Sequence, residues 1–548
     1  MDRQAALAAH HLFGLADPRH YEPLSRRAIT PEYRDALHRL LPDAWVLERG
    51  DVWLHARRAP GSTGRSAPPP IQGFKIHVSS APVHAVRLFE LVVPVCVSYR
   101  VEFKAAADPA MLAVLNSKTQ QRGFSGKFMT LYPPDEHAFA ELIETLYQCT
   151  ADEAVEGPYI LSDRRYRDSR VLFYRYGGFR PPRRLNIDGT QSTFLVAPDG
   201  SYVADERLPL FRLPPWVRDP FAEQPAERPA SEAAARSGAE PGAESGAESG
   251  AESGAESGVE SGVESDVESD GTLLHDRYLV EGALAFSNVG GVYHGTDRLT
   301  GDPVVVKEAR RLTNCWTSGD RTVDAVDMLR HEYEVLRRLE GLDSVPRAVD
   351  LFREWEHTFL VEERLEGVAF HDFWARDEVI LAPYIRREGR VDRFVPLFRE
   401  VAGRLVPMIE EVHARGVVLG DLSPNNVLID ADTLRMRFID FESAVHEDDE
   451  AAMLSYGTRW GTPGFLHPDR SSRSRLLPCD DWYAAAMLLY STVVPATAFF
   501  GLNPAAKDLF LDELVALGVP TQVRSVVSCL AAARVDEAKR VLADWKDG

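Results

Sequence analysis

Residues 417–442, VVLGDLSPNNVLIDADTLRMRFIDFE, decide how this 548-residue chain is interpreted. Asp421 and Asn426 stand five positions apart, between the apolar runs 417–419 and 427–429. Apolar runs of this length are typical of short buried strands. The pattern therefore predicts that a carboxylate and an amide share one loop at the end of a buried strand, and that Asp440 follows further along the chain.

This spacing resembles the protein kinase catalytic loop H-R-D-L-x-x-x-N, and Asp440-Phe441-Glu442 follows where kinases carry D-F-G. In kinases the first carboxylate accepts the proton of the attacking hydroxyl, while the amide and the second carboxylate bind metal ions that bridge the nucleotide phosphates. The resemblance implies that Asp421 is catalytic and that Asn426 and Asp440 bind Mg²⁺. It also implies ATP or GTP as the cofactor.

Upstream residues agree with this interpretation. Lys307 ends a β-branched run, and Glu332 lies in HEYEVLRRLE with apolar residues at helical spacing behind it. Kinases pair a strand lysine with a helix glutamate in order to hold the α- and β-phosphates. A solvated helix face is the alternative for Glu332.

The phosphate-covering loop is degenerate, because the three glycine positions of G-x-G-x-x-G are occupied by Ala285, Ser287 and Gly290. Small residues still let a backbone approach phosphate. The segment from Glu363 to Leu365 is expected to bind adenine through its backbone. Ser423 stands where many protein kinases have a lysine near the γ-phosphate, which leaves the charge-neutralising group open.

About half of the net charge of −21 lies in one low-complexity segment with the repeated tetrapeptide Gly-Ala/Val-Glu-Ser. Such a segment has almost nothing to bury, so it does not offset its ordering entropy. We predict a disordered acidic linker over 216–271. An acidic recruiting tail is the alternative, which the position between two apolar-rich regions disfavours.

Five scattered cysteines and the absence of a signal-like segment or a long apolar run favour a protein of the reducing cytoplasm. Outside the linker the charge is mild, so we expect neither a nucleic acid nor a membrane as partner.

The region before the linker carries many cations on strand-like segments. Lys75 and His77 alternate in GFKIHVSS, so they are expected on one face of a strand. Arg122, Lys127 and the pair Arg164-Arg165 are flanked by Gly or Ser, whose backbone amides add anion donors. A phosphate or sulfate site is one interpretation, and surface cations that never meet are the other.

The segments GFKIHVSS, LNSK, GFSGKFMTLYP, GPYILSDRRY and FYRYGGF, followed by GDLSPNN and IDFE, resemble the class III and class IV lanthipeptide synthetases. That resemblance implies an α+β chain of three parts: a phosphoserine/phosphothreonine lyase-like domain over 1–215, the disordered linker, and a bilobal protein-kinase-like domain over 272–548. It also implies a bifunctional dehydratase. The kinase would phosphorylate Ser or Thr of a ribosomally made precursor peptide, and the lyase would eliminate phosphate to give dehydroalanine or dehydrobutyrine.

By the same resemblance, Lys75 is the expected base of the elimination, because neighbouring cations favour its neutral amine. A phosphate ligand is its alternative role. His55 is the first choice for the acid and His77 the second. Contacts to phosphate and carbonyl groups are expected from several members of a cationic set: Lys104, Lys118, Lys127, Arg164, Arg165 and Arg175.

Only about one hundred residues follow Asp440, so the sequence predicts no LanC-like cyclase within the chain. Either the chain is a fragment of a longer synthetase, or a separate cyclase is a further partner. The leader of the precursor is expected beside the kinase αC helix or on the 1–45 segment. The alternative function is a bacterial Ser/Thr protein kinase with a non-catalytic phospho-binding N-terminal domain, and an inert scaffold is a third.

Overall fold

The computed structural model describes the chain over the following residues: 30–50, 52–59, 70–185, 191–206, 208–222, 271–318, 321–375, 389–457, 461–493, 503 and 505–545. Most of the predicted linker, 223–270, lies outside these residues. So does most of the 1–45 segment, of which residues 30–45 include the helix α3 (Glu32–Leu40).

A seven-stranded antiparallel sheet forms the N-terminal domain, in the order β1-β2-β4-β5-β3-β7-β6. The helices α3, α4 (Ala85–Tyr99), α5 (Pro109–Leu115) and α6 (Glu136–Thr150) contribute to one apolar core. The strands are β1 (Trp45–Arg49), β2 (Trp53–Arg58), β3 (Gln72–Val78), β4 (Phe103–Ala106), β5 (Met129–Leu131), β6 (Arg164–Arg165) and β7 (Leu172–Gly178).

The two faces of this sheet differ because side chains alternate along each strand. Phe74, Ile76 and Val78 of β3 lie on the face covered by the helices α4 (Ala85–Tyr99) and α6 (Glu136–Thr150). Phe74 stacks on Phe139 of α6 with ring centroids 4.9 Å apart. The other face therefore receives the intervening polar residues of the same strands.

Among the described residues, one helical segment, Pro82–Tyr99, is long and apolar enough to cross a membrane, with a mean hydropathy of 1.3 over 18 residues. Leu88, Phe89 and Val92 of this segment have no exposed surface and pack in the N-terminal core. A core helix passes the same test of length and composition, and we interpret α4 in this way.

The N-terminal domain extends beyond residue 215, where its boundary was predicted. Val217 and Phe221 pack against its core, and Asp219 accepts hydrogen bonds from Arg164 and from the Tyr174 hydroxyl. A small sheet precedes this segment, in the order β10-β9-β8, formed by β8 (Arg183–Leu185), β9 (Gln191–Val196) and β10 (Tyr202–Ala204).

The second domain has two lobes. Its first lobe is a six-stranded antiparallel sheet in the order β11-β12-β13-β14-β18-β17, with helix α8 (Ala325–Arg338) packed against β14 and β18. The strands are β11 (Thr272–Leu274), β12 (Tyr278–Ser287), β13 (Gly290–Asp297), β14 (Pro303–Arg310), β17 (Ala348–Glu354) and β18 (His357–Glu363). A hairpin of β15 (Trp316–Ser318) and β16 (Arg321–Val323) precedes α8.

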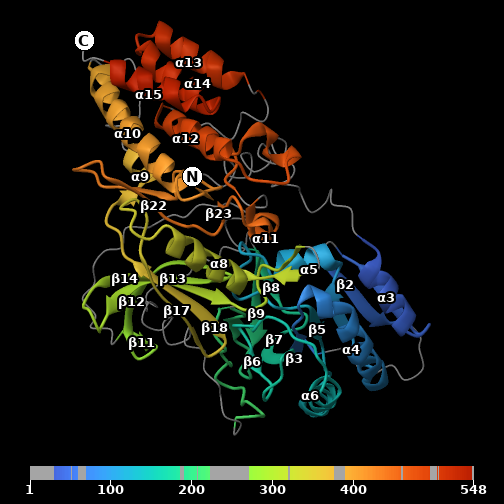
Figure 1. The fold of residues 1–548 in the computed structure, drawn as a ribbon. Helices are drawn as coiled ribbons and strands as arrows, with labels where there is room; N and C mark the ends of the chain where they lie inside the picture. The colour runs from blue at the N-terminus through green and yellow to red at the C-terminus, as the bar shows by residue number, and fades with distance from the viewer. Residues whose placement is uncertain are drawn as a thin grey trace.

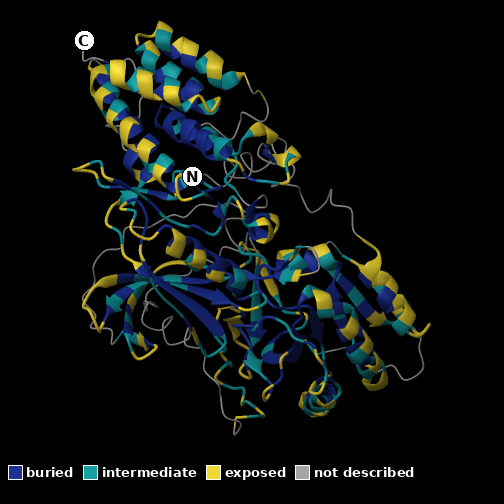
Figure 2. Cartoon of the chain, in the orientation of Figure 1, coloured by how far each residue is buried: buried dark blue, intermediate teal, exposed yellow. Residues whose placement is uncertain are grey.

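The second lobe is mainly helical. Its central helix, α12 (Pro478–Val493), has twelve of its sixteen residues buried and is dark blue along most of its length in Figure 2. The other helical elements are α9 (Phe370–Trp374), α10 (Arg390–His413), α11 (Glu450–Ala452), η4 (Met453–Gly457), η5 (Pro468–Ser472), α13 (Ala506–Ala516), α14 (Thr521–Ala531) and α15 (Val535–Asp544). The catalytic segments lie among the short strands β19 (Val368–Ala369), β20 (Val417–Val418), β21 (Val427–Ile429), β22 (Met436–Phe438) and β23 (Val445–His446).

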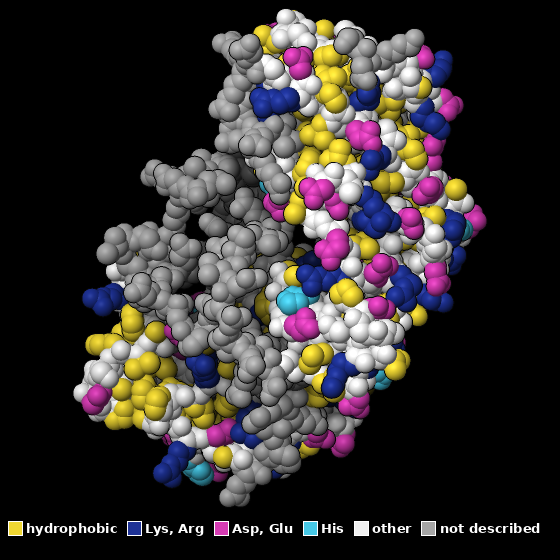
Figure 3. Space-filling model, turned by 90° about the vertical axis from the view of Figure 1, so that its left-hand side faces the viewer, with side chains coloured by type: hydrophobic (Ala, Val, Ile, Leu, Met, Phe, Trp, Pro, Cys, Tyr) yellow, Lys and Arg dark blue, Asp and Glu magenta, His cyan; other side chains and the backbone are white. Residues whose placement is uncertain are grey.

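The N-terminal domain and the first lobe of the second domain lie side by side (Figure 1). Arg165 of β6 forms an ion pair of 2.6 Å with Glu356, and Arg311 forms one of 3.1 Å with Glu156. On the described part of the face in Figure 3, acidic and basic side chains are interspersed rather than gathered by sign. These observations define an α+β chain whose two domains contact each other directly.

Candidate functional site

The kinase cleft begins with an ion pair between β14 and α8. Lys307 Nζ lies 2.6 Å from Glu332 Oε1, and the same oxygen accepts a hydrogen bond of 2.9 Å from the backbone amide of Phe441. Glu332 has no exposed surface, so it does not belong to a solvated helix face. Glu332 thereby connects α8, the lysine strand and the segment that follows Asp440.

A second glutamate, Glu362 of β18, lies 3.3 Å from Lys307 Nζ. Burial opposes the charge on Lys307, but Glu332, Glu362 and Asp440 outweigh it and hold the lysine pKa well above its ordinary value. Burial also raises the pKa of Glu332 and of Glu362. The cleft therefore holds an excess of carboxylates, which favours a bound cation.

Asp421 follows β20, and its side chain is held by the segment that precedes η5. Asp421 Oδ1 accepts hydrogen bonds from the Thr462 amide (2.8 Å) and from the Thr462 hydroxyl (2.9 Å). The Asn426 side chain donates to the Asp421 carbonyl at 2.9 Å, which leaves the amide oxygen of Asn426 as an acceptor. Burial raises the pKa of Asp421, which makes this carboxylate a better proton acceptor.

The loop that carries Asp421 is held by two buried side chains, one from α12 and one from η5. Asp481 of α12 accepts hydrogen bonds from the amides of Leu419 (2.8 Å) and Gly420 (2.9 Å). Arg470 of η5 donates to the carbonyls of Gly420 and Gly457. These bonds hold the catalytic loop on the most deeply buried helix of the lobe.

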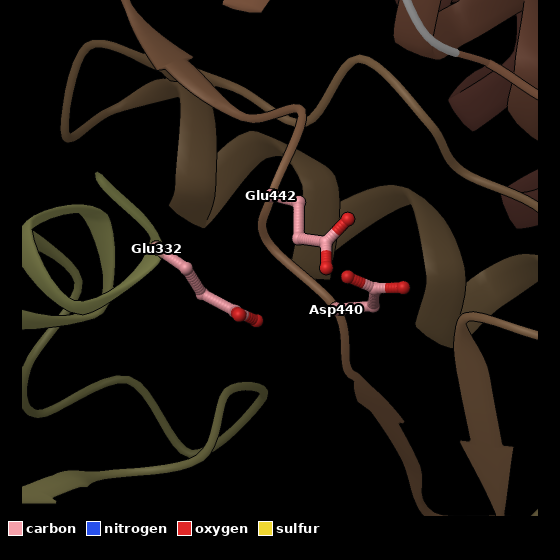
Figure 4. Close-up of side chains that lie close together, drawn as sticks. All are labelled: Glu332, Asp440 and Glu442. Atoms are coloured by element: carbon pink, nitrogen blue, oxygen red, sulfur yellow. The ribbon is translucent and has the colours of Figure 1, made fainter. Parts of the chain in front are cut away.

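Asp440 and Glu442 project from one segment with their carboxylates close together, and Glu332 points from α8 toward the same space (Figure 4). One carboxylate oxygen from each of the three lies within 4.8 Å of the others. Burial opposes ionisation of Asp440, but Lys118 and Lys307 hold its pKa below the ordinary value. The Asp440 carboxylate and the Asn426 amide oxygen are hard donors of the kind that Mg²⁺ prefers, so these two residues fit this ion.

The phosphate-covering turn connects β12 and β13, with Ala285 paired to Val292 and Ser287 paired to Gly290. A Cβ at Gly290 would lie 1.8 Å from the Glu308 carbonyl oxygen, so a glycine is required there by the approach of β14. The buried Arg310 donates to the Asn288 carbonyl at 2.7 Å. The turn is thus held in place by its own sheet.

The adenine segment begins at the end of β18. The amide of Glu363 donates to Arg347 at 2.9 Å, and the amide of Arg364 donates to Pro303 at 3.3 Å. Both amides therefore bond to backbone carbonyls of the protein. If this segment binds adenine as predicted, the Glu363 carbonyl and the Leu365 amide are the groups that would contact it.

In the N-terminal domain, the strand register places five polar residues and Phe173 in a row across the sheet face that α4 and α6 do not cover. Directly paired residues of antiparallel strands point to the same face. The row contains His55, Lys104, Thr130, His77, Phe173 and Arg165, each paired with the next. Lys75 pairs with Arg175 on the same face, two positions from His77 and Phe173.

His77 and Asp163 form a buried hydrogen-bonded pair through His77 Nδ1. Burial lowers the pKa of His77 to about 3, and the charges of Lys127 and Lys75 act in the same direction, so the imidazole is neutral. Although burial opposes it, interactions with His77 and Lys127 hold the pKa of Asp163 below its ordinary value. Lys127 Nζ lies 3.8 Å from Asp163 and donates to Ser162 Oγ at 3.0 Å.

Lys75 and Arg175 converge beside Gly177. Lys75 Nζ and an Arg175 guanidinium nitrogen each lie 3.3 Å from the position that a Cβ on Gly177 would occupy, and Asp205 Oδ1 lies 3.4 Å from it. Arg175 donates to Asp205 at 2.6 Å, and the side chain of Asp205 is almost fully buried. A lysine amine therefore lies next to an arginine whose orientation is fixed.

His55 lines a separate pocket of about 120 Å³ with Arg57, Tyr132 and Arg180. Burial, together with Arg57 and Lys104, lowers the pKa of His55. Lys104 Nζ lies 3.9 Å above the Trp53 ring. His55 and Lys104 thus share the polar face with Lys75, but they lie several strands away from it in the sheet order.

Three further residues that were predicted to contact phosphate lie away from Lys75 and Arg175. Arg164 points to the helix-covered face and forms an ion pair of 2.5 Å with Asp219. Arg165 contacts Glu356 of the kinase lobe and stacks over Tyr159. Lys118 reaches Glu442 in the kinase cleft. The structure therefore gathers Lys75, His77, Lys127 and Arg175 and separates Arg164, Arg165 and Lys118 from them.

Several acidic and polar partners were not predicted from the sequence, notably Asp163, Asp205, Glu362 and Thr462. Asp163 and Asp205 each lie beside other charged residues, and nothing in the sequence distinguishes a buried partner of a cation from a solvated loop residue. For Glu362 a usable signal existed, because alternation in β18 puts Glu362 and Glu363 on opposite faces.

The fold and these two clusters define a class of protein: an α+β domain with a cationic sheet face, followed by a protein kinase domain. Residues 33–233 match the family model described as RamC, N-terminal domain, and residues 280–520 match the model described as protein kinase domain. The resemblance to the class III and class IV lanthipeptide synthetases is thereby confirmed.

Among individual relatives, the chain is 32% identical to the Probable SapB synthase of Streptomyces coelicolor over 502 residues, which cover 91% of this chain and 47% of that protein. It is 28% identical to the Serine/threonine-protein kinase PknL of Mycobacterium bovis over 270 residues, 48% of this chain and 62% of the kinase. The chain thus spans less than two thirds of the length of either relative.

Proposed function

We propose that this chain is a bifunctional dehydratase of lanthipeptide biosynthesis. Its kinase domain would phosphorylate Ser or Thr of a ribosomally made precursor peptide, and its N-terminal domain would eliminate the phosphate. One observation carries the proposal: Lys75 lies beside Arg175 and the His77–Asp163 pair, in the same chain as the Lys307–Glu332 ion pair of a kinase-like cleft. The similarity to a synthase whose printed name refers to SapB supports a peptide substrate.

In the kinase step, Asp421 would accept the proton of the substrate hydroxyl, and Thr462 would hold the carboxylate in its orientation. Lys307 would contact the phosphates of ATP, or of GTP. Mg²⁺, when bound by Asp440 and Asn426, supplies positive charge for the transferred phosphoryl group. A cytoplasmic location belongs to this proposal, because ATP and newly made ribosomal peptides occur together there.

In the lyase step, the Lys75 amine would take the proton from the α-carbon of the phosphorylated residue. The Cβ–O bond then breaks, its electron pair leaves with phosphate, and a Cα=Cβ double bond remains. The adjacent Arg175 cation favours the neutral amine and stabilises developing negative charge. Because His77 and His55 are both held toward the neutral form, we assign stabilisation of the departing phosphate to Arg175 and Lys127.

The leader of the precursor peptide has a candidate place between the two domains. A pocket of about 330 Å³ lies beside the start of α8 and is lined from both domains, with Val83, Glu156, Asp324, Asp327 and Arg330 among its walls. A peptide bound there would contact the helix that carries Glu332. Ring closure by a separate cyclase is the subsequent step of this proposal.

The test is the intact mass of a candidate Ser/Thr-containing precursor peptide after incubation with Mg²⁺, ATP and enzyme. Wild type is expected to remove about 18 Da per modified residue, whereas Lys75→Met should leave a gain of about 80 Da because it phosphorylates without eliminating. Asp421→Asn is expected to give neither change. Lys539→Met, which alters an exposed ion pair with Glu410, is the matched control and should behave as wild type.

A phosphorylated product that is stable with the wild type as well as with Lys75→Met would contradict the lyase half. It would favour the alternative function, a Ser/Thr protein kinase whose N-terminal domain binds phosphate without catalysis.

A further inference from the structure

One segment of the N-terminal domain, residues 116–122, crosses to the kinase domain. It follows helix α5 (Pro109–Leu115) and precedes β5, and we name it the docking segment. Its backbone contacts the phosphate-covering turn: the Asn288 amide donates to the Lys118 carbonyl at 3.1 Å, and the Asn288 side chain donates to the Ser117 carbonyl at 2.9 Å. The turn that covers nucleotide phosphates is thus tied to the other domain.

Further contacts fix the docking segment at both ends. The amide of Asn314 donates to the Asn116 carbonyl at 2.7 Å. The Arg122 guanidinium lies 4.7 Å above the Phe286 ring, and one of its nitrogens lies 3.8 Å from Glu308. The segment therefore has a defined position on the kinase lobe, which in turn defines where the side chain of Lys118 points.

Lys118 Nζ lies 2.9 Å from Glu442 Oε2, and a carboxylate at this distance favours the charged form of a lysine. The Lys118 side chain keeps 42% of its surface exposed and that of Glu442 keeps 25%. The pair therefore lines an open cleft instead of being sealed in a core. An ion pair this exposed adds little to stability, so its removal should leave the fold intact.

The charges of the cleft explain what the pair can do. Glu332, Glu362, Asp440 and Glu442 bring four carboxylates, and the kinase strand lysine Lys307 brings one ammonium. Residues 421–426 and 440–442, which carry the catalytic carboxylates, contain neither lysine nor arginine. Lys118 thus adds a cation that these segments do not provide. It lies beside Glu442, which occupies the position where kinases have the glycine of D-F-G.

We propose that Lys118 is a positioning residue of the kinase site, supplied by the N-terminal domain, which neutralises Glu442 and holds it away from the nucleotide phosphates. Without Lys118, the Glu442 carboxylate repels the anionic Mg·ATP complex and competes for Lys307. Full phosphoryl transfer then requires the docked N-terminal domain. The inference rests on the kinase half of the proposed function and is independent of the lyase half.

The experiment uses the full chain carrying Lys75→Met, so that phosphopeptide accumulates and elimination does not interfere. Phosphorylation kinetics with Mg·ATP and the precursor peptide are compared for Lys118→Met, Lys118→Arg, Glu442→Gln and the double variant Lys118→Met/Glu442→Gln. We expect Lys118→Met to lower kcat/KM for ATP at least about tenfold, which corresponds to a modest change in binding free energy. Lys118→Arg should recover most of the loss, because the charge is kept.

The double variant distinguishes the proposed role from a structural one. If Lys118 acts through Glu442, removing both charges should return activity to within about threefold of Glu442→Gln alone, as for two coupled residues. Glu356→Gln, which breaks the ion pair with Arg165 between the same domains, is the matched control and should stay near the parent value. A Lys118→Met enzyme as active as its parent, or a double variant no better than Lys118→Met, would overturn the inference.

A second measurement separates this inference from the proposed function. The affinity for Mg·ADP, followed by the shift of the thermal midpoint, needs no peptide substrate. It should weaken in Lys118→Met and recover in the double variant. If wild type fails to modify the peptide but nucleotide binding follows this order, the proposed substrate is wrong and the role of Lys118 stands. Equal Mg·ADP affinity in all variants would refute that role.

Discussion

At the scale of single residues, strand alternation decides which charged groups meet. Arg164 and Arg165 are neighbours in the sequence, yet one pairs with Asp219 on the helix-covered face and the other reaches Glu356 of the kinase lobe. Glu362 and Glu363 diverge in the same way, since only Glu362 enters the cleft of Lys307. Adjacent like charges in a strand thus have unrelated roles.

The buried His77 predicts a pH dependence of stability. Its pKa is about 3 in the folded protein and about 6.5 when unfolded, so the unfolded state binds more protons between these values. Stability is therefore complete above pH 6.5 and is lost as the pH falls toward 3, by up to about tenfold in the folding equilibrium per pH unit.

Thermal midpoints of wild type and His77→Asn at pH 7 and pH 5 test this dependence. The wild-type midpoint should fall more between the two pH values, because the variant lacks the titrating imidazole. The other histidines are common to both proteins and cancel in the comparison. Parallel decreases in the two proteins would show that His77 does not titrate on unfolding.

At the scale of elements, α8 links the kinase chemistry to its fold. Asp324 caps this helix by accepting hydrogen bonds from the amides of Val326 (2.9 Å) and Asp327 (3.1 Å), and it also accepts one of 2.7 Å from Leu312. The Asp327 carboxylate in turn accepts a hydrogen bond of 3.2 Å from the Asp324 amide, which completes a capping box. Glu332 lies two turns further along α8, so its position depends on this N-terminal cap.

Asp324→Ala should destabilise the protein by roughly 1–2 kcal/mol and also weaken Mg·ATP binding, because the helix that positions Glu332 loses its cap. Thermal melting and the KM for ATP measure the two effects. Asp324→Asn keeps an accepting oxygen and should lie between wild type and Asp324→Ala. An unchanged KM in Asp324→Ala would show that packing alone positions α8.

At the scale of the whole molecule, the docking segment makes the two domains one unit around the nucleotide cleft. The Asn288 turn is bonded to Ser117 and Lys118, so a ligand that orders the turn should also order the docking segment. The two proposed steps, phosphorylation and then elimination, therefore take place in domains that contact each other directly.

Hydrogen exchange measures this coupling. Addition of Mg·ADP is expected to slow exchange in peptides that cover residues 114–124 as well as in those that cover the phosphate turn, because fewer openings occur when both are ordered. Asp440→Asn, which weakens the expected Mg²⁺ site, should abolish both effects. Protection confined to the kinase domain would indicate that the docking segment moves independently of nucleotide.

The sequence alone determined the α+β class, and the resemblance of its short motifs to those of protein kinases indicated the kinase domain and the candidate residues Lys307, Glu332, Asp421, Asn426 and Asp440. Likewise, the period of two placed Lys75 and His77 on one face. Only the tertiary structure decided that Arg175 joins Lys75, that Asp163 and Asp205 are buried partners, and that Lys118 faces Glu442, 324 positions away. Pairings of this kind depend on how sheets and domains pack, and no local pattern of residues encodes them.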